Sequence, residues 1–323
     1  MGSEMCIRDR YNKITITTGE TQNVSRETFP MRHCIKQKNK IKKAFFIGKE
    51  KKLCYNRLVI ENEREETDMG RIITIANQKG GVGKTTTAIN LAACLAEAGQ
   101  HVMLVDFDPQ GNASSGLGLE EKDFERTVYD MLAEEASVEE CISREVQENL
   151  DVLPSDMNLA AAEIEFQEVD NKEKLLKQSL DQIRDNYDFI LIDCPPSLNI
   201  LTINALTAAD TVLVPIQCEY YALEGLNQML KTVDLVKRKL NPSLEMEGVV
   251  FTMYDARTNL SLQVVESVKS NLNQTIYKTI IPRNVRLAEA PSHGMPINRY
   301  SSRSTGAESY RMLAAEVISR GEV

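Results

Sequence analysis

The sequence has no Trp and only three His, and aromatic residues make up just 6% of its 323 residues. The three His, at positions 33, 101 and 293, lack the spacing of a metal-binding cluster. Seven Cys are scattered without a CxxC pair, which excludes a zinc ribbon, argues against a disulfide scaffold and favours a reducing compartment. No apolar run approaches the ~18–20 residues of a membrane-spanning helix, and the opening residues lack the apolar core of a secretory signal. We therefore expect a cytoplasmic protein.

Positive charge is scarce after residue 68. Residues 1–68 carry 15 Lys and Arg against 10 Asp and Glu, whereas the remainder carries 23 against 37. The first segment is rich in Lys and Asn and has no sustained hydrophobic period. Met69 is then followed by Gly70, Arg71 and an apolar run, which resembles the start of a protein. We interpret residues 1–68 as a non-native or disordered leader and residues 69–323 as the functional domain. The alternative for the leader is a basic arm that contacts nucleic acid.

Linkers rich in Gly, Ser or Pro are also absent from residues 69–323, which favours one domain. Short apolar runs alternate there with stretches of helical periodicity, and several runs are continuous, as in parallel strands buried on both faces. This alternation predicts the α/β class, with a doubly wound, mostly parallel sheet flanked by helices. The predicted strands are 72–76, 102–105, 152–153, 189–192, 212–216, 249–252 and 276–281, and the predicted helices are 85–98, 172–184, 223–240, 260–272 and 307–319.

The segment between the first strand and the first helix has the composition of a phosphate-binding loop. Its glycines let successive backbone N–H groups point at one anion, and the following helix adds its positive N-terminus. Lys84 would face the β- and γ-phosphates, the Thr85 hydroxyl would ligate Mg²⁺, and Thr86 would reach the α-phosphate. Gln78 replaces the first Gly of the usual GxxxxGK[ST] pattern. The alternative is an ordinary Gly-rich turn. The loop residues are Lys79, Gly80, Gly81, Val82, Gly83, Lys84, Thr85 and Thr86.

Carboxylates follow two of the predicted strands, at the edge where a doubly wound sheet places its ligands. Asp106 and Asp108 follow the strand 102–105, and Asp193 follows the run 189–192. A carboxylate after four apolar residues is typical of the Walker B acid near Mg²⁺. The alternative for Asp193 is a strand-terminal residue that caps the following loop.

Four blocks together resemble the ParA/Soj chromosome-partitioning ATPases, which are P-loop NTPases of the MinD-like deviant Walker A class. The blocks are KGGVGKTT (79–86), DFDPQGNAS (106–114), DCPPS (193–197) and IPRNVRLAEAPS (281–292), and segments 219–225 and 254–259 fit the same family. The resemblance covers residues 69–323. It implies an ATPase, using ATP and Mg²⁺, that forms a homodimer with ATP and binds double-stranded DNA nonspecifically. It also implies chromosome or plasmid partitioning with a ParB/Spo0J-type partner, and a cytoplasmic, nucleoid-associated location.

The resemblance also implies roles for individual residues. Lys79 would reach across the dimer to the partner's phosphates, much as an arginine finger does, and Gly81 would lie at the subunit contact. Asp108 would orient the attacking water, while Asp106 and Asp193 would hold the Mg²⁺ shell. Hydrolysis would be slow until the partner protein completes the site. The remaining implied residues are Pro282 and Asn284, near the nucleotide base, and Arg257 and Arg286, on DNA.

Two alternatives share the nucleotide chemistry. A MinD-like positioning ATPase should end in a basic amphipathic helix, which residues 319–323 do not suggest, so no stable membrane association is expected. An iron–sulfur carrier or reductase needs a pair of ligating cysteines in suitable loops, and the sequence offers no such pair. We interpret Cys194, next to Asp193, as a small buried residue.

DNA binding is the implied activity that overall charge disfavours, since the pI is about 5.1. Binding would therefore need a local basic patch. The alternative is that these residues are scattered, solvated charges. The residues that could extend the patch beyond Arg257 and Arg286 are Lys269, Lys278, Arg283, Arg299 and Arg303.

Overall fold

The computed structural model describes residues 5–9, 12–16, 69–272 and 274–321. The chain divides into two compact units, Met1–Thr67 and Asp68–Val323. In the first unit, β1 (Met5–Asp9) pairs antiparallel with β2 (Asn12–Ile16). The rest of the segment that we interpret as a leader lies outside the described residues. The second unit holds the sheet and the candidate site, and everything below concerns it.

The second unit is built on an eight-stranded sheet with the order β10-β9-β8-β3-β7-β4-β6-β5. Neighbouring strands are parallel, except that β5 runs antiparallel to β6 at one edge. The first strand of this unit, β3, lies near the centre of the sheet. Later strands extend the sheet on both sides of β3, with β7 inserted between β3 and β4, which is a doubly wound arrangement. The strands are β3 (Arg71–Ile75), β4 (Val102–Asp106), β5 (Ser143–Gln147), β6 (Leu150–Leu153), β7 (Phe189–Asp193), β8 (Thr211–Gln217), β9 (Glu245–Tyr254) and β10 (Ile276–Pro282).

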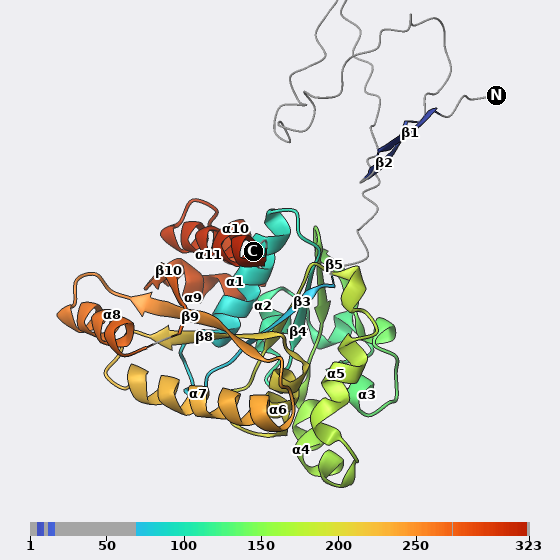
Figure 1. Cartoon of the computed structure of the whole chain (residues 1–323), viewed down its shortest axis with the longest axis horizontal. Helices are drawn as coiled ribbons and strands as arrows, with labels where there is room; N and C mark the ends of the chain where they lie inside the picture. The colour runs from blue at the N-terminus through green and yellow to red at the C-terminus, as the bar shows by residue number, and fades with distance from the viewer. Residues whose placement is uncertain (1–4, 10–11, 17–68, 273, 322–323) are drawn as a thin grey trace, which may run out of the picture. The chain divides into compact units, whose positions relative to one another are not determined.

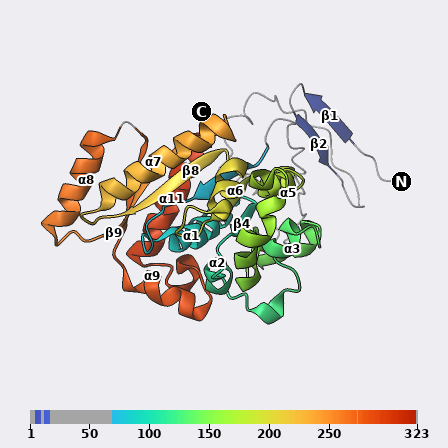
Figure 2. The ribbon, with the colours of Figure 1, turned by 90° about the horizontal axis from the view of Figure 1, so that it is seen from below.

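Helices cover both faces of this sheet (Figure 1). On one face lie α1 (Lys84–Glu97), α2 (Asn112–Gly116), α10 (Ile297–Tyr300) and α11 (Thr305–Gly321). On the other face lie α3 (Val128–Leu132), α4 (Ala162–Glu165), α5 (Leu175–Leu180), α6 (Ile200–Ala208), α7 (Ala222–Lys239) and α8 (Asn259–Asn271). The short helix α9 (Val285–Glu289) follows β10. Figure 2 shows α7 running alongside β8.

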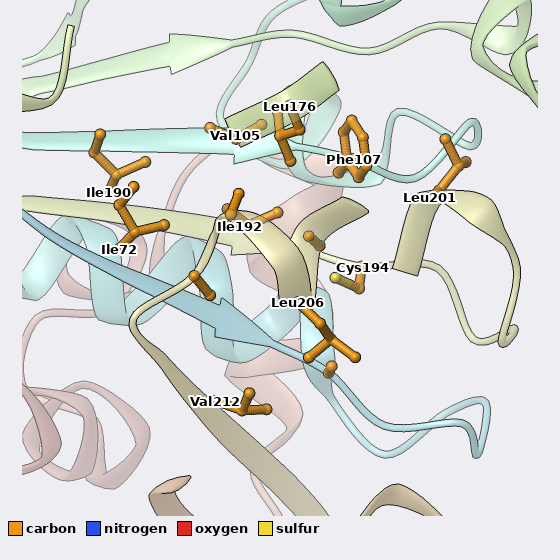
Figure 3. Packing of buried hydrophobic residues seen from close by; sticks show 14 of the residues in the cluster. Ile72, Val105, Phe107, Leu176, Ile190, Ile192, Cys194, Leu201, Leu206 and Val212 are labelled. Carbon is orange, nitrogen blue, oxygen red and sulfur yellow. The ribbon is translucent and has the colours of Figure 1, made fainter. Parts of the chain in front are cut away.

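The continuous apolar runs explain these two layers. All five residues of β4 and of β7 are buried, as expected for central parallel strands with helices on both faces. Successive side chains alternate between the faces, so Ile190 and Ile192 pack on one side of β7 and Leu191 on the other. A hydrophobic core lies on each face of the sheet, and Figure 3 shows the core in which α5 and α6 pack against the strands. Cys194 is fully buried in this core, as predicted.

The α/β class and the mostly parallel sheet are confirmed, but one predicted helix is wrong in its extent, and α6 and the short helices α2, α3, α4, α9 and α10 were not predicted. Of the predicted helix 172–184, only α5 is α-helical, because short 3-10 turns flank it on both sides. Asn171 precedes the first of these turns with φ 57°, which starts the segment with a left-handed residue. Helix α6 is not predicted because seven of its nine residues are buried, so it has no polar face to give a period of 3.6.

Candidate functional site

The glycine-rich loop joins the end of β3 to α1, whose N-cap is Gly83. Gly81 and Gly83 have φ angles of 73° and 87°, in the left-handed region that glycine adopts without a steric penalty. A Cβ atom at Gly81 would meet nothing within 4 Å, so this exposed glycine borders open space. The loop therefore has a curled backbone of the kind that directs N–H groups at an anion.

Two polar side chains outside the predicted site hold this loop in place. Asn77 donates to the Pro215 carbonyl (2.8 Å) and accepts the Lys79 N–H at its Oδ1 (3.0 Å). Thr252 of β9 donates to the Val82 carbonyl (2.8 Å). The sequence analysis finds neither residue. An Asn two residues before Lys79 is a recognisable turn signal, whereas Thr252 lies 170 residues from its partner and gives no local signal.

Asp106 and Asp193 end the neighbouring strands β4 and β7, and they lie opposite each other in the sheet register. Both side chains are completely buried. Burial raises the pKa of Asp193 well above its usual range, and the charge of Asp106 raises it further. Burial also raises the pKa of Asp106 to about 6, although hydrogen bonds from Ser114 act in the opposite direction. Two adjacent buried acids are costly to ionise, so their charged forms need a nearby positive charge to stabilise them.

Lys84, the first residue of α1, supplies part of that charge. Burial lowers the pKa of its ammonium group, whereas the nearby Asp193 raises it. Its Nζ contacts the Lys79 carbonyl at 3.5 Å. Even so, neither oxygen of Asp193 has a hydrogen-bond partner of normal geometry. A buried carboxylate without a hydrogen bond of normal geometry is the clearest feature of the site, because buried polar groups are almost always hydrogen-bonded in folded proteins.

The donor set fits a Mg²⁺ ion that is bound together with phosphate. Within the described part of the chain, no group of three or more His, Cys, Asp or Glu side chains could hold a metal ion. Mg²⁺ typically takes one or two carboxylates and completes its octahedron with waters and phosphate oxygens. Asp106 and Asp193 provide the carboxylates, and the Thr85 hydroxyl lies near enough to Asp193 to lower its pKa. The structure thus brings these three predicted residues together.

Asp108 belongs to the same cluster. It lies two residues beyond the end of β4, is largely buried, and its charge raises the pKa of both Asp193 and Lys84. Its Oδ1 accepts the Gln110 N–H (3.0 Å), which fixes the side chain in a turn. Asp108 therefore lies next to the carboxylate pair, as the sequence analysis expects.

Lys79 has a partner that the sequence analysis does not assign. Its Nζ forms an ion pair with Oε2 of Glu219 (2.8 Å), and the two side chains are 32% and 46% exposed. Glu219 lies between β8 and α7. A cavity of about 400 Å³ beside this pair is lined by Lys79 and by residues of α7. Three large exposed side chains belong to the same region: Leu198, Tyr220 and Tyr221.

Pro282 and Asn284 were predicted to lie near the nucleotide base. Pro282 is the last residue of β10, and Asn284 lies between β10 and α9. Asn284 is the N-cap of α9, where its Oδ1 accepts the Arg286 N–H (2.8 Å). Its Nδ2 donates to the Thr305 hydroxyl (2.9 Å). Both contacts of the Asn284 side chain are structural, so the predicted contact with a base stays a prediction.

Arg257 and Arg286 follow the adjacent strands β9 and β10, at the same end of the sheet as the glycine-rich loop. They are 86% and 58% exposed. Each is already paired with a carboxylate, Arg257 with Asp255 (2.7 and 2.8 Å) and Arg286 with Glu289 (2.8 Å). The other candidate patch residues are also exposed: Lys269, Lys278, Arg283, Arg299 and Arg303.

Two findings concern the alternatives raised by the sequence. Among the described residues, no helix has both the length and the apolar character needed to cross a membrane. The cysteines that the structure describes in the second unit are all buried and free: Cys94, Cys141, Cys194 and Cys218. Burial raises the pKa of the Cys194 thiol well above its usual value, so this residue is a neutral, small side chain of the core.

The fold and the site together define a P-loop NTPase, and comparison with known proteins agrees. Residues 70–246 match the family model of an AAA domain. The chain is 59% identical over 253 residues to the sporulation initiation inhibitor protein Soj of Bacillus subtilis, covering 78% of this chain and 100% of that protein. It is 51% identical to the chromosome partitioning protein ParA of Myxococcus xanthus, covering 80% of this chain and 91% of that protein.

Among solved structures, cobyrinic acid a,c-diamide synthase of Mycobacterium smegmatis with a bound ATP analogue and magnesium is similar, with a TM-score of 0.70 and 35% identity. The match covers 78% of this chain and 96% of that chain. The chain belongs to the Soj/ParA family of chromosome-partitioning ATPases. The expectation of ATP and Mg²⁺ as cofactors is thereby confirmed for the family.

Proposed function

We propose that residues 69–323 form an ATPase that dimerises with ATP, binds double-stranded DNA without sequence preference and partitions a chromosome or plasmid with a ParB/Spo0J-type partner. The observation that carries the nucleotide part is the buried, unpartnered Asp193 beside Asp106, directly next to the glycine-rich loop. The similarity to proteins named Soj and ParA supports the partitioning part. In this proposal, residues 1–68 are dispensable for all of these activities.

At the nucleotide, the loop N–H groups and the Lys84 ammonium bind the β- and γ-phosphates, and Thr86 reaches the α-phosphate. Thr85, Asp106 and Asp193 would hold Mg²⁺, which supplies positive charge to the phosphate oxygens when it is bound. Asp108 orients the attacking water. Near the base we assign Pro282 and Asn284. The loop donors are the N–H groups of residues 80–86.

At the dimer contact, Lys79 reaches the phosphates of the partner subunit and Gly81 permits close approach. Two observations support a contact at this surface. The Gly81 position borders open space, so a side chain there would project outward. Three large side chains near the Lys79 loop are exposed: Leu198, Tyr220 and Tyr221. Hydrolysis is slow until the partner protein adds the missing stabilising groups.

At the DNA, Arg257 and Arg286 contact phosphates, so binding is nonspecific and weakens steeply with salt. Both residues lie at the carboxyl end of the sheet, in the segments that follow β9 and β10. A dimer presents two copies of this surface, so DNA affinity should depend on nucleotide. Nucleoid association would follow from this binding.

Two variants test these parts separately. Lys84→Ala should lower ATP affinity by at least about a hundredfold, because it removes a full charge from the phosphate site. Equilibrium binding of a fluorescent ATP analogue measures this, and affinity within a few-fold of wild type would contradict the nucleotide assignment.

Arg286→Glu should lose DNA binding while keeping ATP-dependent dimerisation. Arg238→Glu on α7 is the matched control, because Arg238 is also exposed and ion-paired but is not one of the residues proposed to contact DNA. Fluorescence anisotropy with duplex DNA at low salt measures the difference. Equal losses in the two variants would show that only overall charge matters.

A further inference from the structure

The Asp106 carboxylate is held by one residue that the proposed function does not use. Ser114 of α2 donates twice to the same oxygen, Oδ2 of Asp106, from its backbone N–H (2.7 Å) and from its hydroxyl (2.8 Å). Both residues are buried, with Ser114 2% exposed. Ser114 closes the block 106–114 that carries part of the family resemblance, yet the sequence gives it no role.

A second contact fixes the direction of the hydroxyl hydrogen bond. The backbone N–H of Ser155, which lies just beyond β6, donates to the Ser114 Oγ (3.2 Å). A hydroxyl has one proton, and a neighbouring N–H can only be received by an oxygen lone pair. The Ser114 proton therefore goes to Asp106. The ends of β4 and β6 are thereby linked through α2.

The consequence is that the two oxygens of Asp106 differ. Oδ2 receives two short hydrogen bonds, whereas Oδ1 has only a long contact with the Asp108 N–H (3.4 Å). Asp193, on the neighbouring strand, has no hydrogen-bond partner of normal geometry at either oxygen. Two short hydrogen bonds from Ser114 orient Asp106, whereas no hydrogen bond of that geometry orients Asp193.

We propose that Ser114 is a positioning residue that fixes the Asp106 carboxylate, with Oδ2 occupied and Oδ1 available, for the Mg²⁺ that accompanies the nucleotide. This inference rests on the proposed nucleotide site and adds a residue to it. Outer hydrogen-bond partners of metal ligands commonly change metal affinity by 10–100-fold when removed. Because the Ser114 N–H remains after substitution by Ala, we expect the lower end of that range.

The chain offers a matched control for this test. Ser155→Ala removes a hydroxyl that is buried and has no hydrogen-bond partner, but keeps the N–H that donates to Ser114. Ser114→Ala removes the hydroxyl that donates to Asp106. The two substitutions delete the same atom type within one network, and only one of them touches the carboxylate.

The experiment measures binding of a fluorescent, non-hydrolysable ATP analogue to the full chain, in EDTA and across a Mg²⁺ titration. We expect Ser114→Ala to raise the half-saturating Mg²⁺ concentration about tenfold while its affinity in EDTA stays at the wild-type value. Ser155→Ala should match wild type in both.

Three results would overturn the inference: a Mg²⁺ midpoint within twofold of wild type for Ser114→Ala, an equal shift in Ser155→Ala, or an equal loss of affinity in EDTA. A wild-type protein whose nucleotide affinity does not respond to Mg²⁺ would instead overturn the proposed nucleotide site itself. The two failures are therefore distinguishable.

Discussion

The two ends of the central sheet bury carboxylates in opposite ways. At the amino-terminal ends of the strands, the buried Glu247 accepts hydrogen bonds from Arg71 (2.7 Å), Thr211 (2.8 Å) and Tyr277 (2.7 Å). At the carboxyl ends, Asp193 is completely buried and neither oxygen has a hydrogen-bond partner of normal geometry. The two acids lie in one sheet and differ in whether the protein supplies their partners.

The contacts around Glu247 join the last helix, α11, to the amino-terminal end of the sheet. Arg71 also donates to the Val317 carbonyl of α11 (3.1 Å), and Arg320 of the same helix donates to the Glu247 carbonyl (2.8 Å). The Arg320 guanidinium stacks on the Tyr277 ring at 3.8 Å. These contacts fasten the last helix to the sheet. A satisfied buried carboxylate thus stabilises the fold, whereas an unsatisfied one marks a place where a ligand completes the structure.

The largest expected effect comes from neutralising one acid at each end. Glu247→Gln should lower the free energy of unfolding by about 2–3 kcal/mol, because Arg71 loses its charged partner. Asp193→Asn should change it by no more than about 1 kcal/mol without ligand, because neither oxygen of Asp193 has a hydrogen-bond partner of normal geometry to lose, and relief of the repulsion from Asp106 offsets the lost attraction to Lys84. Urea unfolding in EDTA measures both changes. The comparison between the two ends fails if both variants are destabilised alike.

The next effect is a pH dependence that arises from Asp106 at the carboxyl end. Burial raises the pKa of Asp106 to about 6 from a usual value of 3.8. A carboxyl whose pKa is higher in the folded state favours folding when it is protonated, so its contribution falls as the pH rises from about 4 to 6. The loss is at most about 3 kcal/mol.

Unfolding free energies in EDTA at pH 4 and pH 7 check this sign. Asp106→Asn should lose less stability than wild type over the same interval, because the titrating group is gone. A variant with the full wild-type pH dependence would show that other groups are responsible.

A smaller effect separates two glycines at opposite ends of α1. Gly81 and Gly99 both have positive φ, 73° and 90°, and a Cβ at either would meet nothing within 4 Å. Valine at either position should therefore cost a similar backbone strain, about 1–2 kcal/mol. Only Gly81→Val should weaken ATP-dependent dimerisation, by at least about tenfold, because only Gly81 lies at the proposed contact.

Size-exclusion chromatography with a non-hydrolysable ATP analogue makes the comparison, with nucleotide affinity measured in parallel. If Gly81→Val dimerises normally, this loop does not lie at the dimer contact. Failed dimers in both variants would mean that strain alone is responsible.

The same comparison explains what the sequence reveals. Strand-terminal acids such as Asp106 and Asp193, and the loop that carries Lys84, could be predicted because each signal occupies a few consecutive residues. Their neighbours in space come from elements far along the chain, so Thr252 and Glu219 have no local signature. The 140 residues between Lys79 and Glu219 show why pairings of this kind need the fold.

Helix α6 and the turn around Asn171 were also not predicted from the sequence, for a different reason. Helix α6 is buried on nearly all sides, and the turn around Asn171 depends on a left-handed residue that is not a glycine. Periodicity detects helices with one polar face, which α6 lacks, whereas residues 172–184 have a helical period that 3-10 turns interrupt. At Asn284 the residue type was noticed, but its helix-capping role appears only when α9 is seen.

The smallest effect concerns the Lys79–Glu219 ion pair at the carboxyl end, whose carboxylate is 46% exposed, in contrast to the buried carboxylate of the Arg71–Glu247 pair. Lys79 is held by Glu219 within its own chain, yet the proposed dimer requires it to reach the partner's phosphates. Exposed pairs are worth about 0.2–1 kcal/mol, so breaking this one is cheap and its removal should favour dimers by at most about fivefold.

Glu219→Gln removes the competing charge, and Glu224→Gln is the control, because Glu224 lines the same cavity without an ion pair to Lys79 in this structure. Analytical ultracentrifugation with a non-hydrolysable ATP analogue gives the dimer dissociation constants. We expect the constant to fall two- to fivefold for Glu219→Gln, and less for Glu224→Gln, where only general charge repulsion changes. A weaker dimer in Glu219→Gln would mean that Glu219 holds Lys79 in position for the partner instead of restraining it. The Lys79–Glu219 pair would then belong to a preformed site, just as the Arg71–Glu247 pair belongs to the preformed fold.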